Sequence, residues 1–163
     1  MANTNAPAVA NRVASPATFS KMKDFRSAPL QDKGTVEFTP TADGDTLLLT
    51  ALPVDATITN IVIGSDDLAS TSVTLNLGFY KTDTAITIID EDALGTVIDN
   101  DGVTAMTDVR FETKGIETIS QRVWELAGLS AKPAYGEMYL ALTVAAVTGP
   151  TAGTVSYYCN YTV

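Results

Sequence analysis

Residues 53–80, PVDATITNIVIGSDDLASTSVTLNLGFY, decide the fold that this sequence predicts. From Val73 to Phe79 the apolar residues occupy every second position, and a period of two is typical of a strand with one buried face. An apolar run over residues 58–63 favours another strand, and the Gly/Asp-rich residues 64–67 between the two form a turn signal. We therefore expect two strands, paired antiparallel, near the middle of an all-β domain.

The length and composition fit one folded domain with an appendage. A chain of 163 residues with 45% hydrophobic content can bury a core without disulfide or metal support. Its apolar runs fall well short of the roughly 18–20 residues of a membrane span. Residues 1–5 lack the positive start of a secretory signal, and no apolar segment follows them. We expect synthesis in a cytoplasm.

The net charge of −9 is divided unevenly along the chain. Residues 1–33 carry five basic and two acidic side chains, whereas residues 34–163 carry five basic and 17 acidic ones. The body is therefore strongly acidic, which disfavours nucleic acid and anionic membranes as partners. The mildly basic leader has the charge to dock on an acidic neighbour, and the alternative is that both segments carry solvated charge.

Residues 1–33 differ from the rest in composition. Ala, Asn, Ser, Thr and Pro dominate, and the few large apolar residues show no sustained period. Such a segment cannot offset its ordering entropy alone, so we expect an extended N-terminal arm that orders against a partner, or else a simple floppy terminus. The candidate partner-binding residues of this arm are Arg12, Phe19, Lys21, Lys23, Phe25 and Arg26.

The body, residues 34–163, shows a strand pattern throughout, with turn signals between the strands. About eight strands with little helix predict an antiparallel β-sandwich or jelly roll. Residues 91–98 and 120–127 each fit either a short helix or a strand, and the last two strands form the clearest pair. The predicted strands are residues 35–39, 46–50, 56–63, 72–80, 85–89, 108–113, 138–144 and 155–163.

The sequence offers little catalytic or metal-binding chemistry. It has no histidine, and Cys159 is its single cysteine, expected to be a small buried apolar residue. Residues 99–102, DNDG, and the acidic residues 90–92 invite a calcium interpretation, but the EF-hand spacing fails. Solvated turns explain these acidic clusters more simply, and a cation site of another kind between loops is the alternative. We therefore expect no enzyme activity, no cofactor and no catalytic or metal-ligating residues.

Two tyrosines near the C-terminus have the opposite parity to the apolar face of their strands. Tyr139 and Tyr158 should therefore point outward. Outward tyrosines suit a binding surface or a subunit contact, and cross-strand packing on the surface is the alternative.

Several stretches of the body resemble small structural proteins of tailed-bacteriophage virions, of the capsid decoration (cement) type. They are residues 52–59 (LPVDATIT), 66–68 (DDL), 75–80 (LNLGFY), 123–129 (VWELAGL) and 157–161 (YYCNY). The resemblance implies a non-enzymatic jelly-roll subunit, often a homotrimer, bound to the major capsid protein on the outer capsid surface. The arm lies outside the resemblance, and no catalytic residue is implied.

The leading hypothesis is therefore a viral structural protein that cements the capsid, made in the host cytoplasm, with its arm lying on the coat protein. The alternatives are a phage tail, neck or fibre subunit that binds a host surface, and a free carbohydrate-binding β-sandwich. The number of copies in the particle separates cement from tail, and glycan binding by a monomer would mark the third. An enzyme ranks last.

Overall fold

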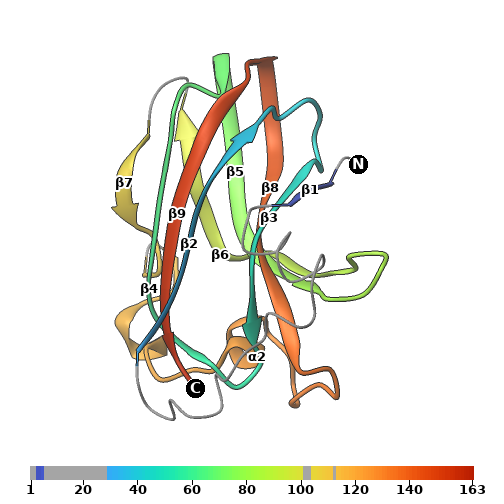
Figure 1. The fold of residues 1–163 in the computed structure, drawn as a ribbon, viewed down its shortest axis with the longest axis vertical. Helices are drawn as coiled ribbons and strands as arrows, with labels where there is room; N and C mark the ends of the chain where they lie inside the picture. The colour runs from blue at the N-terminus through green and yellow to red at the C-terminus, as the bar shows by residue number, and fades with distance from the viewer. Residues whose placement is uncertain (1–2, 6–28, 101–103, 112) are drawn as a thin grey trace.

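The computed structural model describes residues 3–5, 29–100, 104–111 and 113–163, and it shows two packed β-sheets (Figure 1). One sheet has the strand order β1-β3-β8-β5-β6 and the other β2-β9-β4-β7. The strands are β1 (Asn3–Asn5), β2 (Leu30–Phe38), β3 (Thr46–Pro53), β4 (Thr57–Ser65), β5 (Ala69–Lys81), β6 (Ile88–Asn100), β7 (Thr104–Asp108), β8 (Glu137–Pro150) and β9 (Gly153–Thr162). Two short helices, η3 (Ile116–Thr118) and α2 (Val123–Leu126), lie between β7 and β8.

The eight strands β2 to β9 form a jelly roll. Consecutive strands alternate between the two sheets, except for β5 and β6, which form a hairpin within one sheet. Every pairing among these eight strands is antiparallel. The predicted all-β sandwich or jelly roll of about eight strands is thus confirmed.

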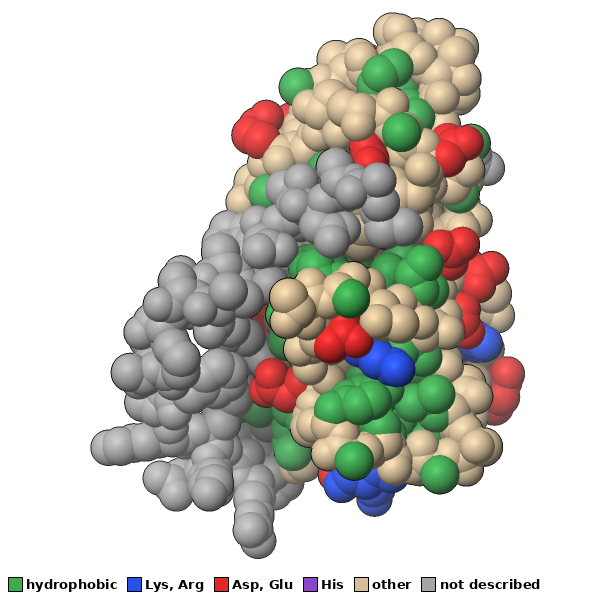
Figure 2. Space-filling model, turned by 90° about the vertical axis from the view of Figure 1, so that its right-hand side faces the viewer, with side chains coloured by type: hydrophobic (Ala, Val, Ile, Leu, Met, Phe, Trp, Pro, Cys, Tyr) green, Lys and Arg blue, Asp and Glu red, His purple; other side chains and the backbone are tan. Residues whose placement is uncertain are grey.

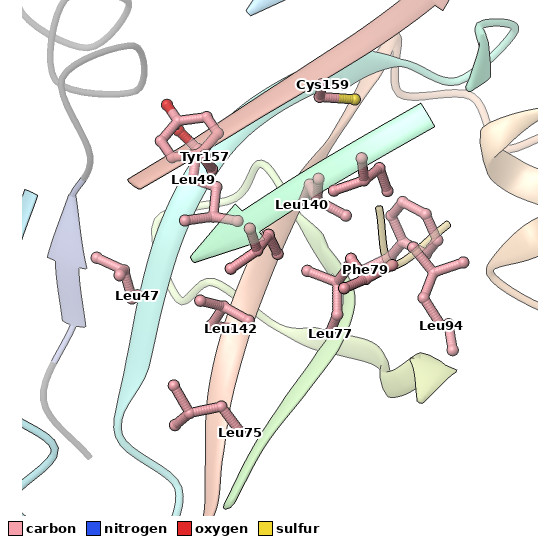
Figure 3. Packing of buried hydrophobic residues seen from close by; sticks show 14 of the residues in the cluster. Leu47, Leu49, Leu75, Leu77, Phe79, Leu94, Leu140, Leu142, Tyr157 and Cys159 are labelled. Carbon is pink, nitrogen blue, oxygen red and sulfur yellow. The ribbon is translucent and has the colours of Figure 1, made fainter. Parts of the chain in front are cut away.

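The core lies between the sheets and is built by alternate residues of each strand. Leu75, Leu77 and Phe79 of β5 are fully buried, as their alternation predicts. They face Tyr157 and Cys159 of β9 across the sandwich (Figure 3). Burial of such side chains contributes about 1.5–3 kcal/mol each, so this double layer dominates the stability of the fold.

The predicted pairing of residues 58–63 with 73–80 is wrong. These segments lie in β4 and β5, which belong to different sheets. Both send their apolar side chains into one core, from opposite sides, so the turn between them crosses the sandwich. Leu68 is buried at the crossing, and the N–H of Asp66 donates to the carbonyl of Thr154 at 2.9 Å.

The same geometry separates the last two strands. β8 pairs with β3 and β5, whereas β9 pairs with β2 and β4, so the expected C-terminal pair is also a crossing between sheets. Alternation of apolar and polar residues shows only that one face of a strand is buried. That face can be buried by a strand of the opposite sheet, so the pattern does not show which strand is the hydrogen-bonded neighbour.

The first strand of the body begins earlier than Gly34. β2 starts at Leu30, which pairs with Tyr161, and it runs antiparallel to β9. The strand lacked an apolar signature because an acidic residue occupies an inward position: the Oδ2 of Asp32 accepts a hydrogen bond from the Thr50 hydroxyl at 2.7 Å. Farther upstream, β1 pairs in parallel with β3, at the edge of the other sheet.

Two further strand predictions need correction. Residues 85–89 begin in a turn, where Asp83 accepts hydrogen bonds from the N–H and hydroxyl of Thr87 at 3.0 and 2.8 Å, and β6 starts only at Ile88. Residues 108–113 lie mostly beyond a strand, because β7 ends at Asp108. Residues 91–98, which fit either a short helix or a strand by sequence, are part of β6. The predicted turn 99–102 lies partly in β6 and partly outside the described residues.

The segment 120–127 contains the helix α2 rather than a strand. Arg122, not Ser120, precedes the first helical residue, and its N–H donates to the carboxylate of Glu125 at 2.7 Å, which closes the N-terminal turn. Gly128 follows the helix with φ of +71°, a conformation that glycine adopts without strain. The Trp124 ring packs against the core from this helix.

Candidate interaction surfaces

The arm residues proposed from sequence lie outside the described residues. This applies to Arg12, Phe19, Lys21, Lys23, Phe25 and Arg26. The described chain flanks this segment at two places, since Asn5 pairs with Leu48 of β3 and Leu30 pairs with Tyr161 of β9.

Tyr139 and Tyr158 both point away from the core, as their parity predicts, and both are half-buried. They belong to β8 and β9, however, which lie in different sheets, so they occupy opposite outer faces of the sandwich. One surface patch cannot contain both. Tyr139 packs against a cluster formed by Leu48, Tyr80 and Ala141, which is cross-strand packing within its own sheet.

That cluster is a small second core on the outer face of the five-stranded sheet. Leu48, Tyr80 and Ala141 are almost completely buried, and Ile86 packs beside them. The Tyr80 hydroxyl forms a short hydrogen bond with the hydroxyl of Thr143. Burial raises the pKa of Tyr80, so this phenol stays neutral at physiological pH. The sequence pattern predicted neither this cluster nor the hydrogen bond between Tyr80 and Thr143.

Tyr158 lines a groove of about 610 Å³ on the outer face of the four-stranded sheet. Its outer rim includes an exposed Met106, whose side chain is 49% exposed. Two hydrogen-bonded cross-strand pairs flank it, the Gln31 amide to Asn160 at 3.0 Å and the Thr35 hydroxyl to Ser156 at 3.1 Å. The residues that line it with Tyr158 are Gln31, Lys33, Gly34, Thr35, Met106, Ser156 and Tyr157.

Sequence reasoning missed this groove because it placed β2 partly in the arm. Once β2 begins at Leu30, Gln31, Lys33 and Thr35 alternate on its outer face, each directly opposite an outward residue of β9. Lys33 pairs with Tyr158 in this register. Residues 31–35, QDKGT, contain no apolar side chain to alternate with the polar ones, so the sequence carried no strand signal there.

A third surface exposes large apolar side chains from the loop after β7 and from the residue after β9. Ile116, Ile119 and Val163 are 65%, 45% and 56% exposed. The two isoleucines belong to the loop between β7 and α2, and Val163 follows the last strand. Sequence reasoning did not single out these residues, because a loop offers no periodicity to judge them by.

A buried arginine holds this loop against β4. Arg110 is fully buried, and its guanidinium donates to the carbonyl of Ile58 at 3.3 Å and to the hydroxyl and carbonyl of Thr118 at 3.1 and 2.9 Å. It also lies 4.7 Å from the centre of the Phe111 ring. Burial lowers the pKa of Arg110, although arginine remains charged at any physiological pH.

The charged side chains beside α2 form a small network. Asp55 binds the ammonium of Lys132 and the guanidinium of Arg122, the latter at 3.1 Å. These contacts, with the Lys132 hydrogen bond as the main cause, lower the pKa of Asp55. Both cations are more than half exposed, so the pairs contribute little to stability.

The reactive groups of the described residues are few. Cys159 is buried, as predicted, and burial raises the pKa of its thiol far above the usual range, which makes it a poor nucleophile. Asp90 and Asp92 lie close together, and desolvation raises the pKa of Asp90. Among the described residues, no group of three or more Cys, Asp or Glu side chains is placed to hold a metal ion. No helix in the described chain is long and apolar enough to cross a membrane.

The architecture places the chain in the class of eight-stranded jelly rolls, which includes viral capsid and lectin domains. Within that class, a chain from the capsid of Ralstonia phage GP4 has a TM-score of 0.60 at 18% identity, and the match covers 99% of this chain and 97% of that one. At this identity the likeness shows a shared fold.

Two other phage capsid structures are less similar. A chain of the cyanophage Pam1 capsid asymmetric unit has a TM-score of 0.44 at 19% identity, covering 84% of this chain and 86% of that one. A chain of the acid-stable capsid of Helicobacter pylori bacteriophage KHP30 has a TM-score of 0.42 at 12% identity, with 82% and 91% covered. No protein-family model and no curated protein matches the sequence.

Proposed function

We propose that this protein is a non-enzymatic capsid decoration (cement) subunit, which binds the major capsid protein on the outer surface of a phage capsid and stabilises the shell. One observation carries the proposal: the chain shares its fold, from end to end, with a chain of similar length in a phage capsid. The resemblance of residues 52–59, 75–80 and 123–129 to decoration proteins supports the same role. The burial of the only thiol agrees with a structural role.

Copy number in purified particles tests this proposal. The chain is quantified against the major capsid protein by mass spectrometry with isotope-labelled peptides. A cement subunit is present in hundreds of copies, in a fixed ratio to the coat protein. A few copies per particle would identify a tail, neck or fibre subunit instead, and absence from particles would reject any virion role.

The proposed arm attaches the subunit to the shell. Its basic side chains and two phenylalanines suit an acidic, partly apolar strip of coat protein, and binding supplies the ordering free energy that the segment lacks alone. Many copies attached in this way stabilise the shell through weak individual contacts.

The structure sharpens the deletion that tests the arm. Removal of residues 2–33 would destroy the first part of β2, which begins at Leu30, so the deletion should end at residue 28. This shorter deletion still removes β1, a three-residue strand at the edge of the five-stranded sheet. We expect the shortened chain to fold and to lose most of its binding to shells stripped of this protein. A full-length variant with Arg12, Lys21, Lys23 and Arg26 replaced by Ser separates charge from length. Full occupancy by both variants would reject the arm's role.

The proposed homotrimer can use Tyr158 or Tyr139 at one contact, but not both. In a cyclic trimer the two contacting patches are related by a rotation that closes the ring, whereas contacts through opposite faces generate an open stack. The Tyr158 groove is the better contact, because Tyr139 packs on its own sheet. Replacement Tyr158→Ser should shift the mass measured by analytical ultracentrifugation from trimer to monomer. The matched variant Thr154→Ser, on the same face of β9, should not.

A further inference from the structure

Most loops of the sandwich gather at two opposite ends, which differ in chemistry, whereas the hairpin between β5 and β6 projects to the side (Figure 1). The acidic end comprises the loops after β2, β4 and β8, which are residues 39–45, 66–68 and 151–152. The isoleucine end comprises the loop after β3, the segment between β7 and β8 and the last residue, which are residues 54–56, 109–111, 113–136 and 163.

The acidic end is polar and carries one sign of charge. Asp43, Asp66 and Asp67 are exposed there, and its described residues include no Lys or Arg. On the side of the molecule shown in Figure 2, the upper part likewise displays acidic side chains, while the basic ones lie in the lower half. Such a surface is well hydrated and repels a second acidic surface.

The isoleucine end is apolar and nearly balanced in charge. Ile116 and Ile119, 65% and 45% exposed, are three residues apart on η3 and its C-cap. Side chains at this spacing are eclipsed in a 3₁₀ helix, so the two isoleucines share one face. Two exposed isoleucines on one face form an apolar surface that suits an interaction site.

This apolar pair is held rigidly. Thr118, between the two isoleucines, receives two hydrogen bonds from the buried Arg110, and its own hydroxyl donates to the carbonyl of Gly115 at 2.8 Å. Because the loop is already ordered, binding through the isoleucines sacrifices little conformational entropy.

The strand pairing brings the arm and the C-terminus to the same end. Thr57 pairs with Thr162 on one side and forms an isolated bridge with Arg122 on the other. Leu30, where the chain returns from the arm, pairs with Tyr161. The C-terminal side of the arm proposed to lie on the coat protein therefore joins the body at the isoleucine end, whereas its N-terminal side follows β1, next to Leu48 of β3.

We propose that the isoleucine end docks on the outer surface of the capsid shell, where Ile116 and Ile119 enter an apolar depression of the major capsid protein. The acidic end then faces solvent, outward from the particle. This orientation rests on the proposed cement function and adds a second contact, separate from that of the arm.

The test compares two full-length double variants that add the same charge at opposite ends. Ile116→Glu with Ile119→Glu alters the proposed contact, and Ala42→Glu with Ala152→Glu alters two exposed alanines at the acidic end. Both should keep the wild-type melting temperature. In co-sedimentation with stripped shells, we expect the isoleucine variant to bind about tenfold more weakly or worse, and the alanine variant to bind like the wild type.

Each other outcome overturns a distinct statement. If wild-type protein does not bind shells, the cement function falls and the docking proposal falls with it. If wild-type protein and the isoleucine variant bind equally, the cement function stands and this contact is rejected. If the alanine variant alone loses binding, the orientation is reversed. If the isoleucine variant only changes the subunit's own oligomeric state, the isoleucine end is a contact between copies.

Discussion

Replacement of Arg110 by Met should destabilise the protein and open the loop that carries the exposed isoleucines. The side chain is fully buried, and its guanidinium is the donor that joins Ile58 of β4 to Thr118 of the loop. Methionine keeps much of the volume beneath the Phe111 ring but cannot donate a hydrogen bond.

The cost follows from the acceptors that remain. The Thr118 carbonyl loses its guanidinium donor but still accepts the N–H of Gln121 at 3.0 Å. The Ile58 carbonyl also loses its guanidinium donor, and a buried acceptor left short of a donor costs about 1–3 kcal/mol. The Thr118 hydroxyl keeps its bond to Gly115. Removal of a buried charge returns part of this cost, because burial disfavours the guanidinium, as its lowered pKa indicates. We expect a net loss of about 1–2 kcal/mol.

Urea unfolding measures the loss, and amide hydrogen exchange locates it. The N–H groups of Thr118, Ile119 and Gln121, bonded within the loop, should exchange faster in the variant, whereas those of β5 and β8 should change only through global stability. The control Lys114→Met removes a half-exposed cation from the same loop and should stay within about 0.5 kcal/mol of wild type. A variant Arg110→Met as stable as wild type, with unchanged loop exchange, would refute this account.

Three further changes test other parts of the fold. Tyr157→Phe removes a buried 2.7 Å hydrogen bond to the Leu49 carbonyl and should cost about 1–2 kcal/mol by urea unfolding, and no loss would mean that water replaces it. Asp55→Asn should cost less than about 1 kcal/mol at pH 7, because the ion pairs are half exposed. The pKa of Asp55 is lowered in the folded protein, chiefly by Lys132. Its contribution to the free energy of unfolding is therefore present above the ordinary pKa of 3.8 and is lost as the pH falls through the folded pKa. If Asp55→Asn remained less stable than the wild type in strong acid, this explanation would be contradicted. Gly78→Ala would place a Cβ 2.1 Å from the backbone of β6, so we expect little folded protein by circular dichroism, and a native spectrum would show that the hairpin can shift.

The sequence was sufficient for the faces of the strands but not for their partners. Alternation located the buried residues of β5 and β9 correctly, because a period of two depends only on which face of the strand is buried. It paired β4 with β5 wrongly, because a turn such as residues 64–67 can reverse a chain within a sheet or carry it to the other sheet. Only the long-range register of β4 with β9 decides between these, and no local pattern encodes it.

Functional surfaces were predictable to the extent that they follow strand parity. Tyr139 and Tyr158 point outward as expected, but their placement on opposite faces depends on topology. Arg110 was read as a strand residue, although it is a buried loop anchor. The isoleucines at 116 and 119 carried no signal, because their exposure is set by the tertiary contact of Thr118 and not by any sequence period.

The two proposed contacts with the shell strengthen each other because they start from the same end of the body. An arm bound to the coat protein keeps Leu30, and with it the rigid isoleucine end, close to the surface. The second contact then forms at a high effective concentration, so each can be weak while the subunit stays bound. This coupling predicts that shells retain partial binding of either single variant, the arm deletion or the double isoleucine replacement. Only the chain that carries both changes should then bind at background level. If the contacts were independent, the losses in binding free energy of the two single variants would simply add in the combined variant.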